Sequence, residues 1–264
     1  MKALAEFPAQ QRRQIRSVLC DIDDTLTSDG RLTAAAYTAL DSLHHAGLRV
    51  VPVTGRPAGW CDHIARMWPV DGVVGENGAF YFRYDHAAQA MRRRYAEDDA
   101  TRAANRAKLA AVGARIVAAV PGCAISADQP YREADLAIDF CEDVPRLAAD
   151  AIARIVALMR DNGLTAKVSS IHVNGWFGAY DKLGMTKMLF AECFGIDTDR
   201  DNEQIAFIGD SPNDAPMFDY FRHAVGVANV QAFAGRLDAA PAWVTCEKSG
   251  AGFCEFAAAL LAAR

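Results

Sequence analysis

The fold is decided at residues 18–26, which read Val-Leu-Cys-Asp-Ile-Asp-Asp-Thr-Leu. A short apolar run ends there in three carboxylates, those of Asp21, Asp23 and Asp24. A short apolar run bounded by polar residues is typical of a buried strand. In an open parallel sheet, ligands bind in the crevice at the carboxyl ends of the strands. The stretch therefore predicts a buried strand that carries charged groups into a binding crevice.

The segments around this strand alternate between strand and helix patterns. Residues 48–53 and 72–74 are further apolar runs, and the helical pattern before the first of them begins after Thr33 and ends at Gly47. The alternation returns near the C-terminus, with predicted strands at 204–208, 224–227 and 242–245. Such alternation predicts an α/β fold, a doubly wound parallel sheet with right-handed crossovers.

The middle of the chain follows another pattern. A hairpin is predicted at 79–83 and 90–95, helices at 99–120 and 145–161, and alternating strands at 131–140 and 167–174. These elements predict an antiparallel sheet with two helices, which is an α+β unit. We therefore expect an inserted α+β cap domain over residues 85–177, carried by a core made of residues 1–84 and 178–264.

Composition and charge argue against several classes of function. The 264 residues are 52% hydrophobic and 23% charged, as is ordinary for a globular enzyme. The net charge of −5 does not suit a partner such as nucleic acid or an anionic membrane surface. One basic cluster, residues 91–94, is interpreted as a solvated face.

The cysteines and the apolar segments bear on the compartment. Seven cysteines, an odd number without a Cys-x-x-Cys pair, favour a reducing compartment over a disulfide framework or a structural zinc site. The first residues lack the pattern of a signal peptide, and no stretch approaches the 18 apolar residues that suggest a membrane helix. We expect a cytoplasmic protein.

Four polar signatures are expected at strand ends, where the crevice should lie. They are residues 21–25, Thr54-Gly55-Arg56, Lys182, and the stretch Gly-Asp-Ser-Pro-Asn-Asp at 209–214. Clustered carboxylates repel one another, and Mg²⁺ is a hard cation that takes carboxylates and favours phosphate oxygens. Asp21 and Asp210 are the expected ligands, from strands that can be neighbours. A carboxylate beside a metal and a lysine stays ionised and can attack an electrophile.

In this order, the four signatures resemble the four motifs of the haloacid dehalogenase superfamily of phosphohydrolases. The insert between the second and third motifs, preceded by residues 75–79 (Gly-Glu-Asn-Gly-Ala), resembles the α/β cap, type IIB, of sugar-phosphate phosphatases. The resemblance implies a Mg²⁺-dependent phosphatase that hydrolyses a small phosphorylated metabolite, such as a sugar phosphate, through an aspartyl-phosphate.

The resemblance also implies a role for each matching residue. Asp21 would be the nucleophile, and Asp23 would be the general acid and base. The phosphoryl group would be held by Thr54, Gly55 and Lys182. The metal would be bound by Asp21, the backbone carbonyl of Asp23 and Asp210, with Asp214 and Asn213 orienting this site.

Two positions depart from the pattern of the family. Asp24 stands where many relatives have glycine, so it either adds charge to the site or caps the following turn. Lys182 is followed by Leu183, whereas relatives usually show Lys-Gly together. Lys187, five residues further on, is therefore the alternative phosphate-binding lysine.

The cap is expected to select the substrate. On a predicted strand over residues 168–176, alternation places Ser170, His172 and Asn174 on one face, which either contacts the leaving group or faces solvent. Arg132, at the start of the other cap strand, either binds an anionic substrate or forms an ion pair.

Two other functions remain as alternatives. The first is a phosphomutase on the same scaffold, which would need an activating bisphosphate. The second is a non-catalytic regulator that binds phosphate or metal, although binding alone needs no acid/base partner such as Asp23. A nicotinamide-binding protein is disfavoured, because no Gly-x-Gly-x-x-Gly follows a predicted strand.

Overall fold

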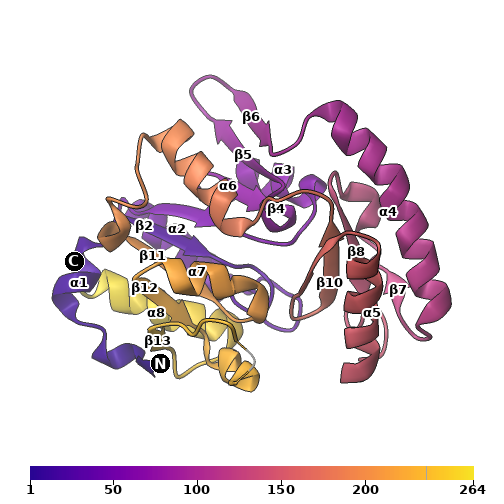
Figure 1. Ribbon diagram of the computed structural model, residues 1–264. Coiled ribbons are helices and arrows are strands. Elements are labelled where there is room, and N and C mark those ends of the chain that lie inside the picture. Colours follow the sequence, from indigo (N-terminus) through magenta and orange to yellow (C-terminus); the bar gives the residue numbers. More distant parts are fainter. Residues whose placement is uncertain (236) are drawn as a thin grey trace.

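The computed structural model describes residues 1–235 and 237–264. Its core is a parallel sheet of six strands in the order β1-β13-β12-β11-β2-β3 (Figure 1). The strands are β1 (Lys2–Ala3), β2 (Ser17–Cys20), β3 (Arg49–Pro52), β11 (Ile205–Gly209), β12 (His223–Gly226) and β13 (Trp243–Val244). This architecture confirms the predicted α/β fold.

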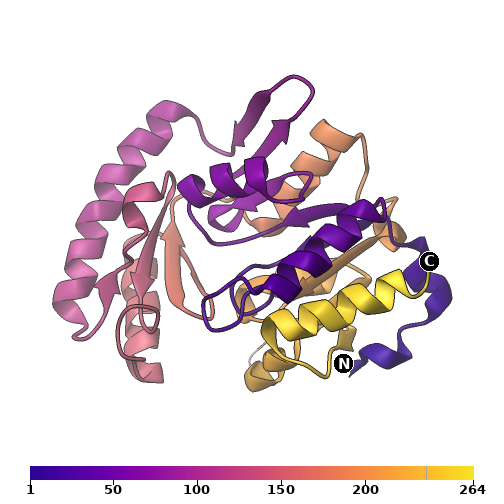
Figure 2. The same ribbon diagram turned by 180° about the vertical axis from the view of Figure 1, so that it is seen from behind.

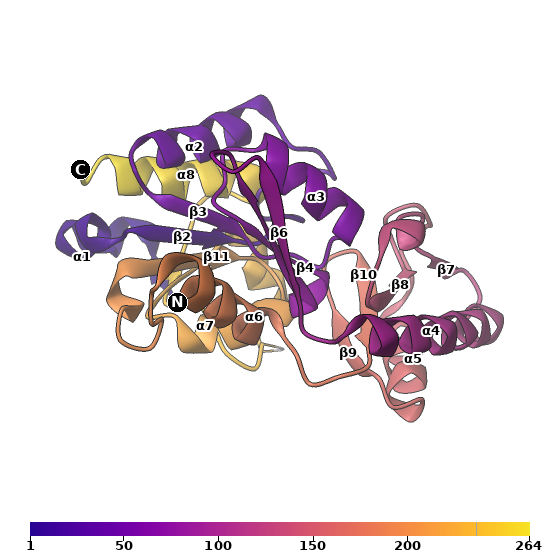
Figure 3. The same cartoon turned by 90° about the horizontal axis from the view of Figure 1, so that it is seen from above.

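Helices cover both faces of this sheet. One face carries α2 (Ala34–His45), α3 (Ala58–Met67) and α8 (Ser249–Leu261), and the other carries α6 (Lys182–Leu189) and α7 (Ala215–Tyr220) (Figure 3). Seen from behind, α2 and α8 lie side by side (Figure 2). Because successive side chains of a strand point to opposite faces, Val18 and Cys20 of β2 enter the first layer and Leu19 the second. The sheet is therefore doubly wound, as predicted.

The ends of the core contain shorter elements. Helix α1 (Ala9–Gln14) is tied to α8 by Arg12, whose Nη1 donates to the carbonyl oxygen of Ala259 at 2.6 Å. Short helical turns complete the chain at η1 (Leu4–Glu6), η2 (Glu76–Gly78), η3 (Gln129–Tyr131), η4 (Phe190–Phe194), η5 (Asn202–Gln204), η6 (Pro212–Asp214) and η7 (Ala228–Phe233). No helix of the described residues combines the length and apolarity needed to cross a membrane.

A second, antiparallel sheet extends the core rather than the insert. It consists of β4 (Val73–Gly75), β5 (Phe80–Asp85) and β6 (Ala90–Tyr95), and a parallel bridge between Val53 and Val74 joins it to the end of β3. The side chains of Phe80 and Phe82 pack in the same cluster as α3. The boundary expected at residue 84 thus falls inside β5, and we propose that the insert begins after Tyr95.

We call residues 99–176 the cap. Its sheet has the order β7-β8-β10-β9 and is antiparallel. The elements are α4 (Asp99–Ala119), β7 (Ala124–Ile125), β8 (Asp135–Asp139), α5 (Ala149–Asp161), β9 (Thr165–Val168) and β10 (His172–Trp176). Both helices lie on the side of this sheet that faces away from the core (Figure 1). The cap has its own hydrophobic cluster, in which Leu136, Ile138 and Val173 meet side chains of the two helices.

One strand prediction for the cap is wrong. Residues 168–176 are not one strand, because a tight turn over 169–171 separates β9 from β10, and the backbone N–H of Ser169 donates to the carbonyl oxygen of His172 at 2.9 Å. Side chains alternate between apolar and polar in both short strands, so the sequence pattern shows no break at the turn between them. The turn places Ser170 beside the face that carries His172 and Asn174 rather than on it.

Candidate active site

The carboxylates of Asp21 and Asp210 meet because their strands are neighbours. Strand β2 pairs with β11 in parallel, with Cys20 opposite Ile208, and each aspartate directly follows its strand. Both side chains are buried. Together with Asp214, they place carboxylate oxygens within 4.8 Å of one another. The expected pairing of the first and fourth signatures is therefore present in the structure.

Lys182 brings the one ammonium group to this cluster among the described residues. Its Nζ donates to Oδ1 of Asp21 at 2.8 Å and to Oδ1 of Asp214 at 2.7 Å. We had expected Lys182 to follow a strand of the parallel sheet. It is instead the first residue of helix α6, whose N-cap residue is Asp181. The alternative, Lys187, is exposed and pairs with Asp199 at 2.9 Å.

Burial and mutual repulsion control the charge of the cluster. Burial raises the pKa of Asp21 to about 8, against the opposing effect of Lys182. The pKa of Asp210 is also raised, by burial first and by the neighbouring Asp21 second. Three buried carboxylates with a single ammonium leave negative charge without a partner. This donor set fits a hard divalent cation, because all of its ligand atoms are oxygens.

Asp214 serves the cluster by holding its neighbours. Its Oδ2 accepts from the backbone N–H of Asp210 at 3.1 Å and of Ser211 at 3.4 Å, while Oδ1 accepts from Lys182. A small cavity lies beside Asp21, and Asn213 is one of the residues that line it. Oδ1 of Asn213 accepts from the hydroxyl of Ser211 at 2.7 Å. Both residues lie where the fourth signature was expected to support the site.

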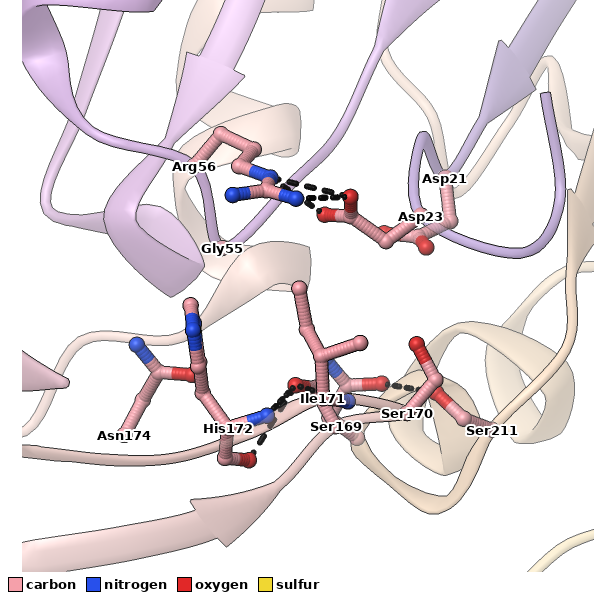
Figure 4. A pocket seen from close by; sticks show the side chains of 11 residues that line it. Asp21, Asp23, Gly55, Arg56, Ser169, Ser170, Ile171, His172, Asn174 and Ser211 are labelled. Atoms are coloured by element: carbon pink, nitrogen blue, oxygen red, sulfur yellow. Dashed lines mark hydrogen bonds and ion pairs between the residues drawn. The ribbon is translucent and has the colours of Figure 1, made fainter. Parts of the chain in front are cut away.

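Asp23 points toward Arg56, as Figure 4 shows. Nη2 of Arg56 donates to Oδ1 of Asp23 at 2.7 Å, and Nε donates to the same carboxylate at 2.9 and 3.0 Å. Two N–H groups of one guanidinium thus orient this carboxylate. Arg56 belongs to the motif Thr54-Gly55-Arg56, but no role was predicted for it; its place two residues after Thr54 was the available signal.

Thr54 and Gly55 form the turn after β3 that faces the same cavity. The hydroxyl of Thr54 accepts from the backbone N–H of Arg56 at 3.0 Å. A methyl group at position 55 would lie 3.1 Å from Nδ2 of Asn77, so a larger residue here requires the Asn77 side chain to shift by a few tenths of an ångström. Gly55 lines the cavity together with Asp21.

The backbone of Asp24 explains why a glycine is common at its position in the resembling family. Its φ is 56°, in the left-handed region that glycine adopts most readily. The turn is capped by Thr27, whose hydroxyl accepts from the backbone N–H of Asp24 at 3.1 Å. Burial raises the pKa of the Asp24 carboxyl, and a contact with Ser170 opposes that shift. Asp24 therefore adds charge beside the site.

Three of the four cap residues reach the cavity. It has a volume of about 10 Å³ and is lined from the cap by Ser170, His172 and Asn174 (Figure 4). Asn174 is oriented by Asp135, to whose Oδ2 its Nδ2 donates at 2.9 Å. The hydroxyl of Ser170 lies close enough to the Asp24 carboxyl to oppose the rise that burial causes in its pKa, but makes no hydrogen bond of ordinary geometry with a described residue. A volume this small holds about one water molecule.

Arg132 does not line this cavity, which corrects its assignment as a substrate-contacting residue. Its buried guanidinium pairs with Asp128 and Asp135, both at 2.9 Å. It also donates to the carbonyl oxygen of Gly55 at 2.9 Å. The ion-pair alternative is thus the one that the structure contains, and it links the cap to the second motif.

Comparisons with known proteins agree with this arrangement. Residues 18–114 match the family model of the haloacid dehalogenase-like hydrolases. A search of curated proteins yielded no match. Among solved structures, a protein from Thermoplasma acidophilum is similar, with a TM-score of 0.69 and 18% identity over 94% of this chain and 98% of the other.

Two phosphatases are among the similar structures. The sucrose-phosphatase of Synechocystis, solved with sucrose and phosphate, has a TM-score of 0.62 and 14% identity over 94% of this chain and 98% of its own. A sugar phosphatase of subclass IIB has a TM-score of 0.58 and 15% identity over 87% and 93% of the two chains. At these identities the likeness concerns the fold. Residues 18–114, which include the first two motifs, thus match the haloacid dehalogenase-like hydrolases in sequence, and the chain as a whole shares the fold of these solved structures, in agreement with the resemblance that the motifs predicted.

Proposed function

We propose that this protein is a Mg²⁺-dependent phosphatase that hydrolyses a small phosphate monoester. The observation that carries the proposal is the pairing of Asp21 with Lys182 inside a buried cluster that also contains Asp210. Lys182 opposes the rise in the pKa of Asp21, and a divalent cation beside it would lower that pKa further and keep the carboxylate ionised as a nucleophile. Asp23, two residues on, supplies the acid/base group that a regulator of pure binding function would not need.

The residues divide the reaction between them. A carboxylate oxygen of Asp21 attacks phosphorus, the bond from phosphorus to the ester oxygen breaks, and Asp23 gives its proton to the departing alcohol. Asp23 then takes a proton from water, whose oxygen attacks the same phosphorus and breaks its bond to Asp21. Inorganic phosphate leaves, and Asp21 is restored. Proton transfer by a placed group contributes a factor of about 10²–10⁴ to the rate.

The surroundings supply the positive charge that this transfer needs. Lys182 and the backbone of Thr54 and Gly55 would hold the phosphoryl oxygens. Mg²⁺, held by Asp21, Asp210 and the carbonyl of Asp23, would neutralise charge on the transferring group when bound. Asp214 keeps Lys182 and Asp210 in place through the contacts described above.

We propose a phosphorylated sugar or a related metabolite as the substrate. The cap presents a hydroxyl, an imidazole and an amide to the cavity, which suit a leaving group that carries hydroxyls. Because the cavity now has room for about one water molecule, the cap must move away from the core to admit such a substrate. The sugar phosphatases among the similar structures support this choice. The cytoplasm, where such metabolites occur, is the proposed location.

A panel of phosphorylated metabolites tests the proposal. The protein is incubated with each compound with and without Mg²⁺, and phosphate release is measured. We expect release from at least one monoester, loss of release on chelation, and loss of release for Asp21→Asn. If no compound is hydrolysed while a sugar 1-phosphate is converted to the 6-phosphate, the protein is a phosphomutase and the proposal fails.

A further inference from the structure

Arg56 sits at the junction of the core and the cap and is held from both sides. Its guanidinium is 4% exposed. On the core side it binds Asp23, and on the cap side its Nη2 donates to Oε1 of Glu142 at 2.6 Å. Nη1 lies 3.4 Å from carboxylate oxygens of Glu142 and Asp128. The ring of Trp60 covers the guanidinium, with its centroid 4.4 Å from Cζ.

Glu142 is itself fixed by the cap. Its backbone N–H donates to Oδ1 of Asp139 at 2.7 Å, which sets the loop after β8. Its Oε2 lies 2.9 Å from Nε2 of His172. Burial opposes the charge of Glu142, but His172 and Arg56 outweigh it and lower its pKa to about 2. Glu142 is therefore an anion with a set direction.

The chain of contacts runs from the cap to the acid/base group of the core. Asp23 has two oxygens, and one must point at the leaving-group oxygen for a proton to pass. Oδ1 of Asp23 accepts from both Nη2 and Nε of Arg56, whereas Oδ2 accepts from Nε alone, so Arg56 sets the direction of the carboxyl group and leaves a lone pair of Oδ2 for the transferred proton. The direction of the guanidinium depends in turn on Glu142, because Asp128, the other cap anion near it, is farther away and is shared with Arg132.

We propose that Glu142 is a positioning residue for the reaction: from the cap it holds Arg56, and Arg56 aims the carboxyl group of Asp23 at the leaving group. This inference rests on the proposed phosphatase function. Arg56 and Glu142 do not donate or accept the transferred proton. They make proton delivery depend on the cap being seated on the core.

A simple latch between the domains would show the same contacts, so the test must separate latch from positioning. A latch affects every substrate alike, because it changes how the cap closes. In the first half of the reaction, positioning of Asp23 matters only where the leaving alcohol needs a proton, whereas the later hydrolysis of the aspartyl-phosphate uses Asp23 as a base for every substrate. A p-nitrophenolate leaves without one, whereas the alkoxide of an alkyl or sugar phosphate does not.

The experiment compares kcat/KM, which covers the steps up to departure of the alcohol, for the parent, Glu142→Gln and Arg56→Lys on p-nitrophenyl phosphate and on the best alkyl or sugar phosphate of the panel. We expect kcat/KM on the alkyl ester to fall about tenfold or more, a part of the 10²–10⁴ that acid catalysis supplies. We expect kcat/KM on p-nitrophenyl phosphate to change less than about threefold, because that leaving group departs unprotonated. Glu142→Asp, which keeps the charge, should recover part of the loss.

Glu133→Gln is the matched control. It makes the same substitution in an exposed cap ion pair, between Arg106 and Glu133 at 2.8 Å, and should leave both substrates unaffected. Thermal unfolding of each variant checks that it folds. Equal losses on the two esters for Glu142→Gln, or no loss on either, would overturn the inference while the phosphatase function stands. A parent protein that hydrolyses neither ester would remove the function and the inference together.

Discussion

The ammonium group of Lys182 lies 2.8 Å from the carboxylate of Asp21, although 161 positions separate the two residues in the sequence. Both side chains are almost completely buried. The cap is inserted between them along the chain, yet the first residue of α6 returns to the end of β2. This pairing joins the two halves of the core at the site of the proposed reaction.

Replacement of Lys182 by Met should destabilise the protein and abolish turnover. The substitution leaves the buried carboxylates of Asp21 and Asp214 without their counter-ion, which costs about 3–5 kcal/mol. Urea unfolding measures the loss at neutral pH. Lys187→Met is the control, because Lys187 is exposed and its pair with Asp199 should contribute less than about 1 kcal/mol. Equal stability of the two variants would contradict the role given to Lys182.

Mg²⁺ should stabilise the folded protein. A ligand that binds only the native state at 100 times its dissociation constant adds about 2.7 kcal/mol to the free energy of unfolding. We expect the melting temperature to rise with Mg²⁺ and to fall back on chelation. Asp210→Asn should lose the effect, whereas Asp199→Asn, which changes an exposed carboxylate, should keep it. A melting temperature that ignores Mg²⁺ in the parent would exclude the cluster as a metal site.

Glu142 should contribute stability that disappears in acid. Its pKa falls from 4.5 to about 2 in the folded protein, because His172 and Arg56 outweigh the effect of burial. A lowered carboxyl pKa stabilises the native state above the unfolded-state pKa, and this contribution is lost as the pH falls through the folded-state value. The difference in unfolding free energy between the parent and Glu142→Gln should be full above pH 4.5 and should vanish near pH 2. A difference that is constant across this window would contradict the assignment.

Ser170→Ala should alter substrate preference without loss of stability. The hydroxyl of Ser170 lines the cavity near the Asp24 carboxyl and makes no hydrogen bond of ordinary geometry with a described residue, so it can bond a hydroxyl of the leaving group. Loss of one such bond, about 0.5–1.5 kcal/mol, should change the ratio of kcat/KM between substrates about two- to tenfold. Ser169→Ala is the matched control, because Ser169 lines the same cavity but its hydroxyl already accepts from the backbone N–H of His172 at 3.0 Å, so the substitution should affect the turn instead. Identical ratios in the parent and Ser170→Ala would place the leaving group elsewhere.

Patterns in the sequence were sufficient to predict those parts of the structure that depend on residues close together in the chain. The alternation of apolar runs predicted the doubly wound sheet, and the carboxylates after the runs at 18–20 and 204–208 predicted the meeting of Asp21 and Asp210. Helix α8 was not predicted, although Phe253, Phe256 and Leu260 have the spacing of a buried helical face and lie fully inside the core.

Contacts that depend on how the cap sits on the core were beyond such patterns. Glu142 reaches Arg56 across 86 positions, and no periodicity of either segment encodes the angle between two domains. For the same reason, the sequence could not decide whether Arg132 forms an ion pair or contacts the substrate. Its acidic partners, Asp128 and Asp135, lie close in the sequence, but its contact with the carbonyl of Gly55 requires the docked cap.

The buried carboxylate of Glu76 limits how this protein can be re-engineered. It accepts backbone N–H bonds from Ala58 in the core at 2.9 Å, and from Glu133, Ala134 and Asp135 at the edge of the cap, at 2.9, 2.6 and 3.2 Å. A chimera that received another lid, or a version trimmed to the parallel sheet alone, would leave this buried carboxyl group without the backbone N–H groups from which it accepts hydrogen bonds. Exchange of the lid should therefore succeed only under one of two conditions. Either residues 133–135 are kept in the new protein, or Glu76 is replaced at the same time by a neutral residue.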